Sequence, residues 1–341
     1  MALDLRQAVS DVLPGVRMDL ERLVRIESVS ADPDRHDQVR RSATVTADLF
    51  RAEGLETRVV DVGGGLPAVI ARRPAPSGQP TVLLYAHHDV QPEGSADAWT
   101  SPPFEPTERD GRLFGRGAAD DKAGIAAHLA AIRAHGTEIP VGVTVFVEGE
   151  EESGSASLPL LLETYRVELA SDVMVIADST NWDIGTPALT TSLRGLAECV
   201  VEVRTLDHAV HSGMWGGVVP DALTALARLL ATLHDDDGDV AVRGLTAAEA
   251  SELDYPETRL RSESGITEGV RLMGSGSVVD RLWTRPAIAV LAIDATRVDK
   301  ASNTLVPVAR AKVSLRVAPG DDAKRAQRCL HEHLVDHAPW G

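Results

Sequence analysis

The first half of the chain contains three apolar runs that each end in charged side chains, and this pattern limits the possible folds more than any other feature. The runs PTVLLYA (80–86), VGVTVFVE (141–148) and DVMVIAD (172–178) have the length and composition of buried strands. An Ala-rich helical stretch occupies 122–135, between the first two runs. Strands that alternate with helices predict a largely parallel sheet that is covered on both faces.

The segment before these strands predicts a helix and a hairpin. Apolar residues recur every three or four positions over 9–24, which predicts an amphipathic helix that Pro14 kinks. Two β-rich runs at 57–62 and 67–72 are separated by three glycines and predict a hairpin. We therefore expect residues 1–185 to form one α/β domain.

A second domain is expected over residues 186–341, where the strand pattern changes. The runs LAECVVEVR and VARAKVSLRV alternate apolar and polar side chains, as strands do when one face of a sheet meets water. Helical patterns at 220–234 and 322–337 complete an α+β module. The acidic run at 235–239 is interpreted as a solvated connection.

Charge and cysteine content argue against several classes of partner. The chain has 51 Asp and Glu against 34 Lys and Arg, and its net charge of -17 repels nucleic acid and anionic lipid surfaces. No apolar run approaches the ~18 residues of a membrane span, and the acidic start lacks the features of a signal peptide. Cys199 and Cys329 form no paired-cysteine motif, so we expect a cytoplasmic protein without a disulfide framework or a thiolate zinc site.

The charged residues at the three strand ends predict a metal site. His87, His88 and Asp89 follow the first strand, an acidic triplet at 150–152 follows the second, and Asp178 ends the third. Because parallel strands place their carboxyl ends at one edge of a sheet, these side chains are expected to converge. Clustered carboxylates raise one another's pKa unless a cation neutralises them. Imidazole and carboxylate ligands without cysteine suit zinc, with manganese or cobalt as alternatives.

The segment LFGRGAADDKAG, between the first two of these strands, is not a phosphate-binding loop. It lacks the Lys-Ser/Thr ending and the third glycine of nucleotide-binding loops. Asp120 and Asp121 would also repel a phosphate, so this acid pair is better suited to binding metal ions.

Together these motifs resemble those of the binuclear zinc metallopeptidases, a family that includes carnosinase-like dipeptidases, carboxypeptidase G, aminoacylase and succinyl-diaminopimelate desuccinylase. YAHHDVQP resembles the family's HxD motif, GRGAADDKAG its bridging-Asp motif and EGEEESGS its EE motif. DVQP, SPPFEP and EESGS are similar to the dipeptidase branch. The resemblance spans essentially the whole chain and implies an α/β fold: a mostly parallel-sheet zinc-hydrolase catalytic domain with an inserted α+β lid and dimerisation domain.

The resemblance implies ligands for two zinc ions per subunit. His87 and Asp178 would bind the first ion, and Glu152 would bind the second. Asp120 would bridge both ions, and the peptide bond between Asp120 and Asp121 would be cis.

The same resemblance implies the catalytic and substrate-binding groups. Asp89 would orient His87, and Glu151 would be the general base that activates a zinc-bridging water. HSGMWGG resembles the lid motif whose histidine, here His211, contacts substrate and stabilises the oxyanion in the partner subunit's active site, which implies a homodimer. NTLVP with KVSLRVAP resembles the lid segment whose arginine, here Arg316, binds the substrate's C-terminal carboxylate.

These implications predict a dizinc, dipeptidase-like hydrolase that cleaves the amide bond of a dipeptide or similar small substrate with a free carboxylate. An N-acyl-amino-acid deacylase acting on acetyl or succinyl groups would use the same chemistry and stays open. A catalytically inert dimeric binding module is the alternative from another class.

One feature of the family has no match in the printed sequence. The family's second zinc has a further histidine ligand in a segment that follows the lid. The final helical stretch resembles the lid itself, so His331, His333 and His337 are poor substitutes. We therefore expect a shortened chain, either a truncated form or a naturally short protein with impaired activity. We also expect an exposed apolar surface where the absent segment would pack.

Overall fold

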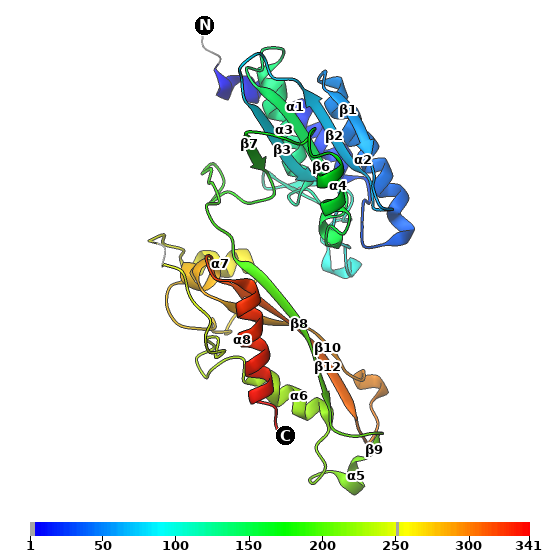
Figure 1. The fold of residues 1–341 in the computed structure, drawn as a ribbon, viewed down its shortest axis with the longest axis vertical. Helices are drawn as coiled ribbons and strands as arrows, with labels where there is room; N and C mark the ends of the chain where they lie inside the picture. Colours follow the sequence, from blue (N-terminus) through cyan, green and yellow to red (C-terminus); the bar gives the residue numbers. More distant parts are fainter. Residues whose placement is uncertain (1–3, 250–251) are drawn as a thin grey trace. The chain divides into compact units, whose positions relative to one another are not determined.

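The computed structural model describes residues 4–249 and 252–341, which fall into two compact units (Figure 1). Unit 1 comprises Met1–Ala188 and unit 2 comprises Leu189–Gly341. The sequence pattern had placed the change at residue 186. Each unit has its own hydrophobic core, and the predicted α/β class is confirmed by the alternation of helices and strands in unit 1.

Unit 1 is built on a five-stranded sheet with the order β1-β2-β6-β3-β7. The strands are β1 (Glu56–Val60), β2 (Ala68–Arg73), β6 (Gly142–Glu148), β3 (Thr81–His87) and β7 (Val173–Ile176). β3 pairs in parallel with β6 and β7, whereas β2 is antiparallel to both β1 and β6. The hairpin prediction is confirmed, but the sheet is mixed rather than largely parallel, because the second strand of the hairpin docks against β6 in the opposite direction.

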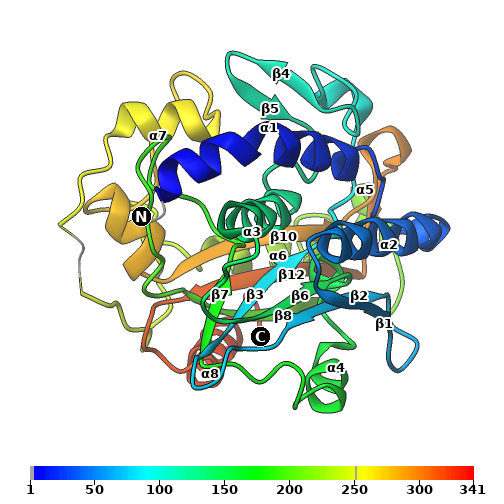
Figure 2. The ribbon, with the colours of Figure 1, turned by 90° about the horizontal axis from the view of Figure 1, so that it is seen from above.

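Helices cover one face of this sheet (Figure 2). They are α1 (Leu5–Val24), α2 (His36–Ala52) and α3 (Lys122–His135), and the short α4 (Leu158–Thr164) packs on the other face. α1 continues through Pro14 as one helix, so the proline does not end it. The sequence reasoning missed α2, because its many β-branched residues are weak helix formers and only burial of one face stabilises it.

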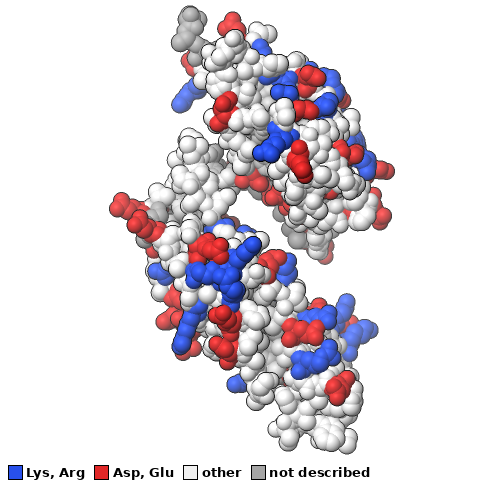
Figure 3. Space-filling view, in the orientation of Figure 1, with Lys and Arg blue, Asp and Glu red and all other residues white. Residues whose placement is uncertain are grey.

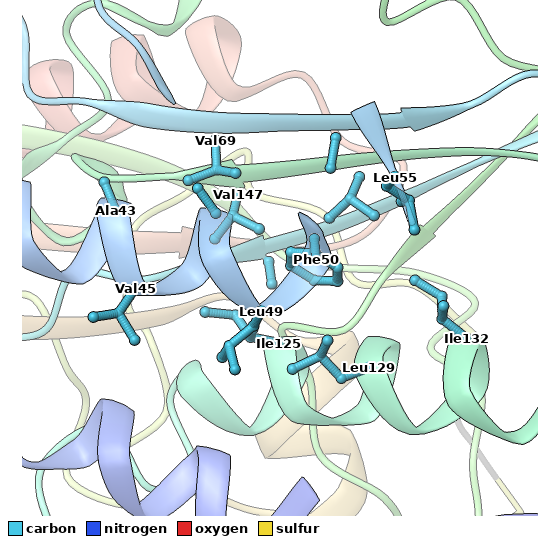
Figure 4. Close-up of a cluster of buried hydrophobic side chains, with 14 of the residues drawn as sticks. Ala43, Val45, Leu49, Phe50, Leu55, Val69, Ile125, Leu129, Ile132 and Val147 are labelled. Atoms are coloured by element: carbon cyan, nitrogen blue, oxygen red, sulfur yellow. The ribbon is translucent and has the colours of Figure 1, made fainter. Parts of the chain in front are cut away.

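The main core of unit 1 lies between α2, α3 and the sheet (Figure 4). Phe50 from α2 and Leu129 from α3 are fully buried, and they face Val69 of β2 and Val147 of β6. Each such large apolar side chain stabilises the fold by about 1.5 to 3 kcal/mol through burial. The two central strands that lead into the candidate site are therefore held by a dense apolar layer.

The edge strand β7 is an exception to the prediction that the sheet is covered on both faces. β6 is buried along its whole length, but the four side chains of β7 are 43% to 58% exposed. These side chains are Val173, Met174, Val175 and Ile176. β7 contacts β3 on one side only, which leaves it at the end of the sheet.

The remaining elements of unit 1 are short. They are the hairpin β4 (Thr107–Arg109) and β5 (Arg112–Phe114), and the 3-10 helices η1 (Pro33–Arg35), η2 (Ala96–Ala98) and η3 (Glu151–Ser153).

Unit 2 contains an antiparallel three-stranded sheet with the order β10-β12-β8. Its strands are β10 (Ala287–Asp294), β12 (Val308–Val317) and β8 (Gly195–Arg204). The helices α6 (Ala222–Ala231) and α8 (Ala323–Asp336) pack on one face, where alternate strand residues form the core. The predictions of an α+β module with one wet sheet face are confirmed.

Several short elements complete unit 2. They are β9 (Val210–His211) paired with β11 (Thr304–Leu305), α5 (Ser212–Trp215), α7 (Glu257–Ser264), the π-helix η4 (Asp280–Thr284) and the 3-10 helix η5 (Val298–Lys300). Among residues 4–249 and 252–341, no helix combines the length and apolar character that a bilayer crossing requires.

Candidate active site

Three neighbouring strands of unit 1 lead to one cluster of candidate ligands. β3 ends at His87, and its parallel neighbours β6 and β7 lead into the acidic triplet and Asp178. Ligand atoms of His87, Asp120 and Glu152 lie within 4.8 Å of one another, and so do those of His87, Asp121 and Asp178. The predicted convergence of these side chains is therefore confirmed.

His87 is fully buried and oriented by its neighbour Asp89. Its Nδ1 donates to the backbone oxygen of Asp89 at 3.0 Å and lies 3.4 Å from Asp89 Oδ1. Its Nε2 faces Asp120 Oδ1 at 3.1 Å and Glu151 Oε2 at 4.0 Å. Burial opposes a charge on His87, but the hydrogen bond and charge of Asp89 outweigh burial and raise its pKa to about 10. The surroundings of Nε2 thus favour a cation, whether a proton or a metal ion.

Asp89 connects the two sides of the cluster. Its carboxylate is fully buried and accepts hydrogen bonds from the backbone nitrogens of Glu151 at 3.3 Å and Glu152 at 3.1 Å. Burial tends to raise the pKa of Asp89, but its interaction with His87 outweighs burial and lowers it. An ionised Asp89 therefore orients the imidazole and fixes the main chain of the acidic triplet at the same time.

Two further side chains position the triplet. Glu150 Oε1 accepts from the backbone nitrogen of Leu66 at 2.7 Å, and Glu150 Oε2 accepts from that of Ser157 at 3.1 Å. Gln91 Nε2 donates to Glu152 Oε2 at 2.7 Å. Glu150 is thus occupied in joining two loops, which leaves Glu151 and Glu152 as the members of the triplet available for chemistry.

The loop that carries Asp120 is anchored by the two residues after it. The Asp120–Asp121 peptide bond is cis, as the resemblance implied. Asp121 is buried, caps α3 through Gly124 and accepts from the backbone nitrogen of His87 at 3.1 Å. Lys122 is fully buried, and its Nζ lies 2.8 Å from the backbone oxygens of both Leu23 and Ile26. Burial lowers the pKa of Lys122 to about 7.

Several carboxylates gather around the single imidazole of His87, and no Lys or Arg side chain in the described part of the chain neutralises them. Burial and the charge of Asp178 raise the pKa of Glu151, and burial and the charge of Asp120 raise that of Glu152. Burial, reinforced by Asp178, raises the pKa of Asp121 to about 7. Within the described residues, no Lys or Arg forms an ion pair with any of these carboxylates. A bound divalent cation would remove this repulsion.

The donor set and its spacing fit a divalent metal ion. Two ligands bound tetrahedrally to one zinc ion lie about 3.3 Å apart, close to the separation of His87 Nε2 and Asp120 Oδ1. The ligands are one imidazole and several carboxylates without thiolates, a set that also suits manganese or cobalt. His87, Asp120, Glu152 and Asp178 could therefore hold metal, and Asp121 is a further candidate.

The two predicted substrate contacts lie in unit 2. His211 is exposed in β9, and its Nδ1 accepts a hydrogen bond from the backbone nitrogen of Gly213 at 3.0 Å. In a neutral imidazole the other nitrogen then carries the proton, so Nε2 of His211 faces solvent as a donor. Arg316 is exposed near the end of β12, on the wet face of the sheet.

The other histidines singled out in the sequence make structural contacts. His88 is fully buried and bonds to the backbone oxygen of Pro67 at 2.8 Å, and burial lowers its pKa to about 4. In unit 2, His333 bonds to Thr232, and its ring stacks on His337 at a centroid distance of 4.0 Å. Neither group of possible metal ligands includes the histidines of α8.

The contacts of three supporting residues of this site were not predicted. Glu150 and Asp121 were expected near the metal site and Lys122 had no assigned role, but the groups that they bind were not foreseen. A signal was present for Lys122, since a lysine beside two aspartates at the start of an apolar helix is expected to be paired or buried for a reason. Its actual partners are backbone oxygens at the end of α1, which no sequence pattern reveals.

Comparisons with known proteins agree with this geometry. The profile described as "Peptidase family M20/M25/M40" matches residues 83–324. The chain is 34% identical to the cysteinylglycine-S-conjugate dipeptidase of Corynebacterium striatum over 331 residues, which is 95% of this chain and 72% of that one. It is 30% identical to the β-Ala-His dipeptidase of Homo sapiens over 347 residues, covering 93% of this chain and 68% of that one.

A solved structure shows the same fold. The crystal structure of human carnosine dipeptidase 1 superposes with a TM-score of 0.83 and 28% identity, covering 99% of this chain and 77% of that one. Profile, relatives and fold agree on one assignment. The chain belongs to peptidase family M20/M25/M40.

Proposed function

We propose that this chain is a metal-dependent dipeptidase that hydrolyses the amide bond of small peptides with a free C-terminal carboxylate. The observation that carries the proposal is the convergence of His87, Asp120 and Glu152 next to Glu151, in a cluster of carboxylates that no Lys or Arg of the described residues pairs with. The printed names of two relatives, which act on cysteinylglycine conjugates and on β-Ala-His, support dipeptides as the substrate class.

The ligands would be His87 and Asp178 for one ion, Glu152 for a second, and Asp120 between them. When bound, a zinc ion supplies a water of lowered pKa and a polarised carbonyl. Manganese or cobalt would serve the same role with this donor set.

Glu151 would act as the general base and then the general acid. Its carboxylate lies 4.0 Å from His87 Nε2, so it is beside the candidate ligands and can reach a water bound there. It would take a proton from the attacking water and deliver that proton to the departing amine. The raised pKa of Glu151 suits this role, because a more basic carboxylate is the better proton acceptor.

His211 and Arg316 would bind the substrate from two different subunits. β12 rises about 3.3 Å per residue, so Arg316 lies about 26 Å along the strand from Val308. His211 lies in β9, beyond the end of the sheet where β12 begins (Figure 1). A dipeptide spans only about 7 Å. One substrate therefore cannot contact both residues of one chain, which supports a homodimer in which His211 serves the partner's site and donates to the oxyanion.

Two alternatives stay distinguishable. An N-acyl-amino-acid deacylase would use the same residues on acetyl or succinyl substrates, and an inert dimeric binding module would use none of them. The dipeptidase names of the relatives favour a dipeptidase over both alternatives. We also propose a cytoplasmic location. The free thiols of Cys199 and Cys329 support it, because neither forms a disulfide.

The decisive experiment assays the purified chain with zinc or manganese on Ala-Ala, N-acetyl-alanine and N-succinyl-alanine. Metal content per chain is measured in parallel by mass spectrometry. Hydrolysis of Ala-Ala that disappears in Glu151→Ala supports the proposal. Cleavage of the acyl substrates alone would identify a deacylase, and metal binding without hydrolysis of any substrate would support the inert module.

A further inference from the structure

The wet face of the unit-2 sheet carries charged side chains that are neutralised along part of the sheet only. In the middle of β12, Lys312 Nζ lies 2.8 Å from Glu198 Oε2, and toward the start of the strand Arg310 Nη2 lies 2.6 Å from Glu202 Oε2. Figure 3 shows basic and acidic side chains interspersed over the visible surface of this unit. These two basic groups are therefore compensated within the fold.

Arg316 has different neighbours at the other end of the same strand. It lies opposite Leu196 on β8 and Ala287 on β10, so neither flanking strand offers it an acid directly across. Arg194 lies just before β8 on the same face as Leu196, because side chains alternate along an extended chain. It is thus one of two diagonal neighbours of Arg316 on this side, and the other, Glu198, is paired with Lys312.

These two guanidinium groups are close to each other and lack acidic partners. Within residues 4–249 and 252–341, neither Arg194 nor Arg316 forms a hydrogen bond or an ion pair through its side chain. Burial and the positive charge of Arg316 together lower the pKa of Arg194. Adjacent like charges are unfavourable unless an anion joins them, and planar guanidinium groups match the geometry of a carboxylate.

We propose that Arg194 and Arg316 form a single anion subsite, in which Arg194 supplies a second guanidinium group to the carboxylate of the substrate. This inference rests on the proposed function, which assigns a free carboxylate to the substrate. A carboxylate has about four acceptor positions on its two oxygens, enough for the fork of one arginine and a further donor from the other. Arg194 is then a specificity-determining residue, because a substrate without the carboxylate leaves two neighbouring charges uncompensated.

The kinetic test compares Ala-Ala with its C-terminal amide in four proteins: wild type, Arg194→Met, Arg316→Met and Arg310→Met. Arg194→Met is expected to lower kcat/KM for Ala-Ala about tenfold, chiefly through KM, because it removes a charge-assisted contact to the substrate. Its kcat/KM for the amide should change little, so the preference for the free carboxylate shrinks. Arg194→Lys should recover part of the loss. Arg310→Met removes a neutralised arginine from the same strand and should leave both substrates unaffected.

The second test reads binding without hydrolysis and without a variant. Phenylglyoxal modification of the wild-type protein is mapped by peptide mass spectrometry with L-alanine or L-alaninamide present. L-Alanine should protect Arg194 and Arg316 together and leave Arg310 unprotected, and L-alaninamide should protect neither member of the pair.

Several outcomes would overturn the subsite. They are equal losses on Ala-Ala and its amide in Arg194→Met, no loss in that variant, protection of Arg316 alone, or protection of neither arginine. A wild type that hydrolyses no peptide would contradict the proposed function instead, and the modification experiment would still decide whether Arg194 binds a carboxylate. Circular dichroism of each variant separates a lost contact from a lost fold.

Discussion

The charged side chains at the two sheets of this protein have different partners. At the ends of β3, β6 and β7 in unit 1, several carboxylates gather around His87, and no Lys or Arg in the described residues pairs with them. On the wet face of unit 2, Glu198 and Glu202 each bind a basic side chain of the neighbouring strand. Paired charges on a surface contribute little to stability, whereas carboxylates that a rigid core holds together repel one another until protons or a cation neutralise them.

The same contrast applies within unit 2. Arg310 and Lys312 have acidic partners, but Arg316 and Arg194 have none, although all four belong to or adjoin the same sheet. Exposure does not distinguish Lys312 from Arg316, because both are exposed, but the acidic partner of Lys312 does.

The largest expected effect comes from removing the proposed general base from the unpaired cluster. Glu151→Ala should lower kcat for Ala-Ala by about a thousandfold, within the range of general base catalysis, because the other carboxylates beside His87 are assigned to the metal ions or to the fold. The measurement is a steady-state assay with metal content determined on the same sample. Glu163→Ala, which removes an exposed acid on α4, is the control and should retain full activity. Comparable activity in both variants would refute the assignment of Glu151.

Metal removal should distinguish the two units by their thermal stability. If the carboxylates of unit 1 need a cation, zinc at about 100 times its dissociation constant stabilises the folded state by about 2.7 kcal/mol. A chelator should therefore lower the melting temperature of unit 1 by several degrees, as followed by calorimetry. Asp120→Asn should abolish this response, whereas Asp97→Asn, an exposed acid away from the cluster, should keep it. An identical response in both variants would place the metal elsewhere.

Two lysines offer a sharper comparison between buried and exposed charge. Lys122→Met removes the two buried hydrogen bonds from Nζ to the backbone oxygens of Leu23 and Ile26 and should destabilise the protein by about 2 kcal/mol. Lys312→Met breaks an exposed pair with Glu198 and should have little effect. Urea unfolding of both variants checks this prediction, and equal midpoints would show that the anchoring of the Asp120 loop by Lys122 contributes nothing to stability.

The smallest expected effect depends on pH and lies in unit 2. Asp321, which precedes α8, is held by Arg325 and by the backbone nitrogen of Thr246, and the hydrogen bond from Arg325 lowers its pKa to about 2. A pKa below that of the unfolded chain, ~3.9, means that the ionised form stabilises the fold above that value. Asp321→Asn should therefore melt about 2 °C lower than the wild type at neutral pH.

This difference should shrink as the pH falls from about 4 toward 2, because the wild-type carboxylate then becomes protonated. Asp336→Asn, an exposed acid at the end of α8, serves as the control in the same thermal scans. A difference that is independent of pH would mean that the side-chain amide, rather than the lost charge, destabilises the variant.

Much of the candidate site could be predicted from the sequence. The strand runs that lead to His87 and Asp178, the acidic triplet and the Asp120–Asp121 segment were all identified from their order along the chain, and the structure brings them together. Such predictions succeed because periodicity and turn residues are local properties that translate directly into strands and their ends.

Other features depended on contacts between distant segments. The direction of β2 against β6 and the open edge at β7 follow from packing that no local pattern encodes. The supporting roles of Lys122 and Glu150 are of the same kind, since their partners are backbone groups that are distant in sequence.

The sequence by itself determined which residues are candidates for the chemistry and which class of ion they suit, because side-chain type and motif order are local properties of the chain. Only the tertiary structure decided which charges are neutralised. Glu198 and Arg194 are a few residues apart, yet one faces Lys312 and the other faces Arg316. The register of β8 against β12 makes that difference, and register is set by the packing of the whole sheet on its helices.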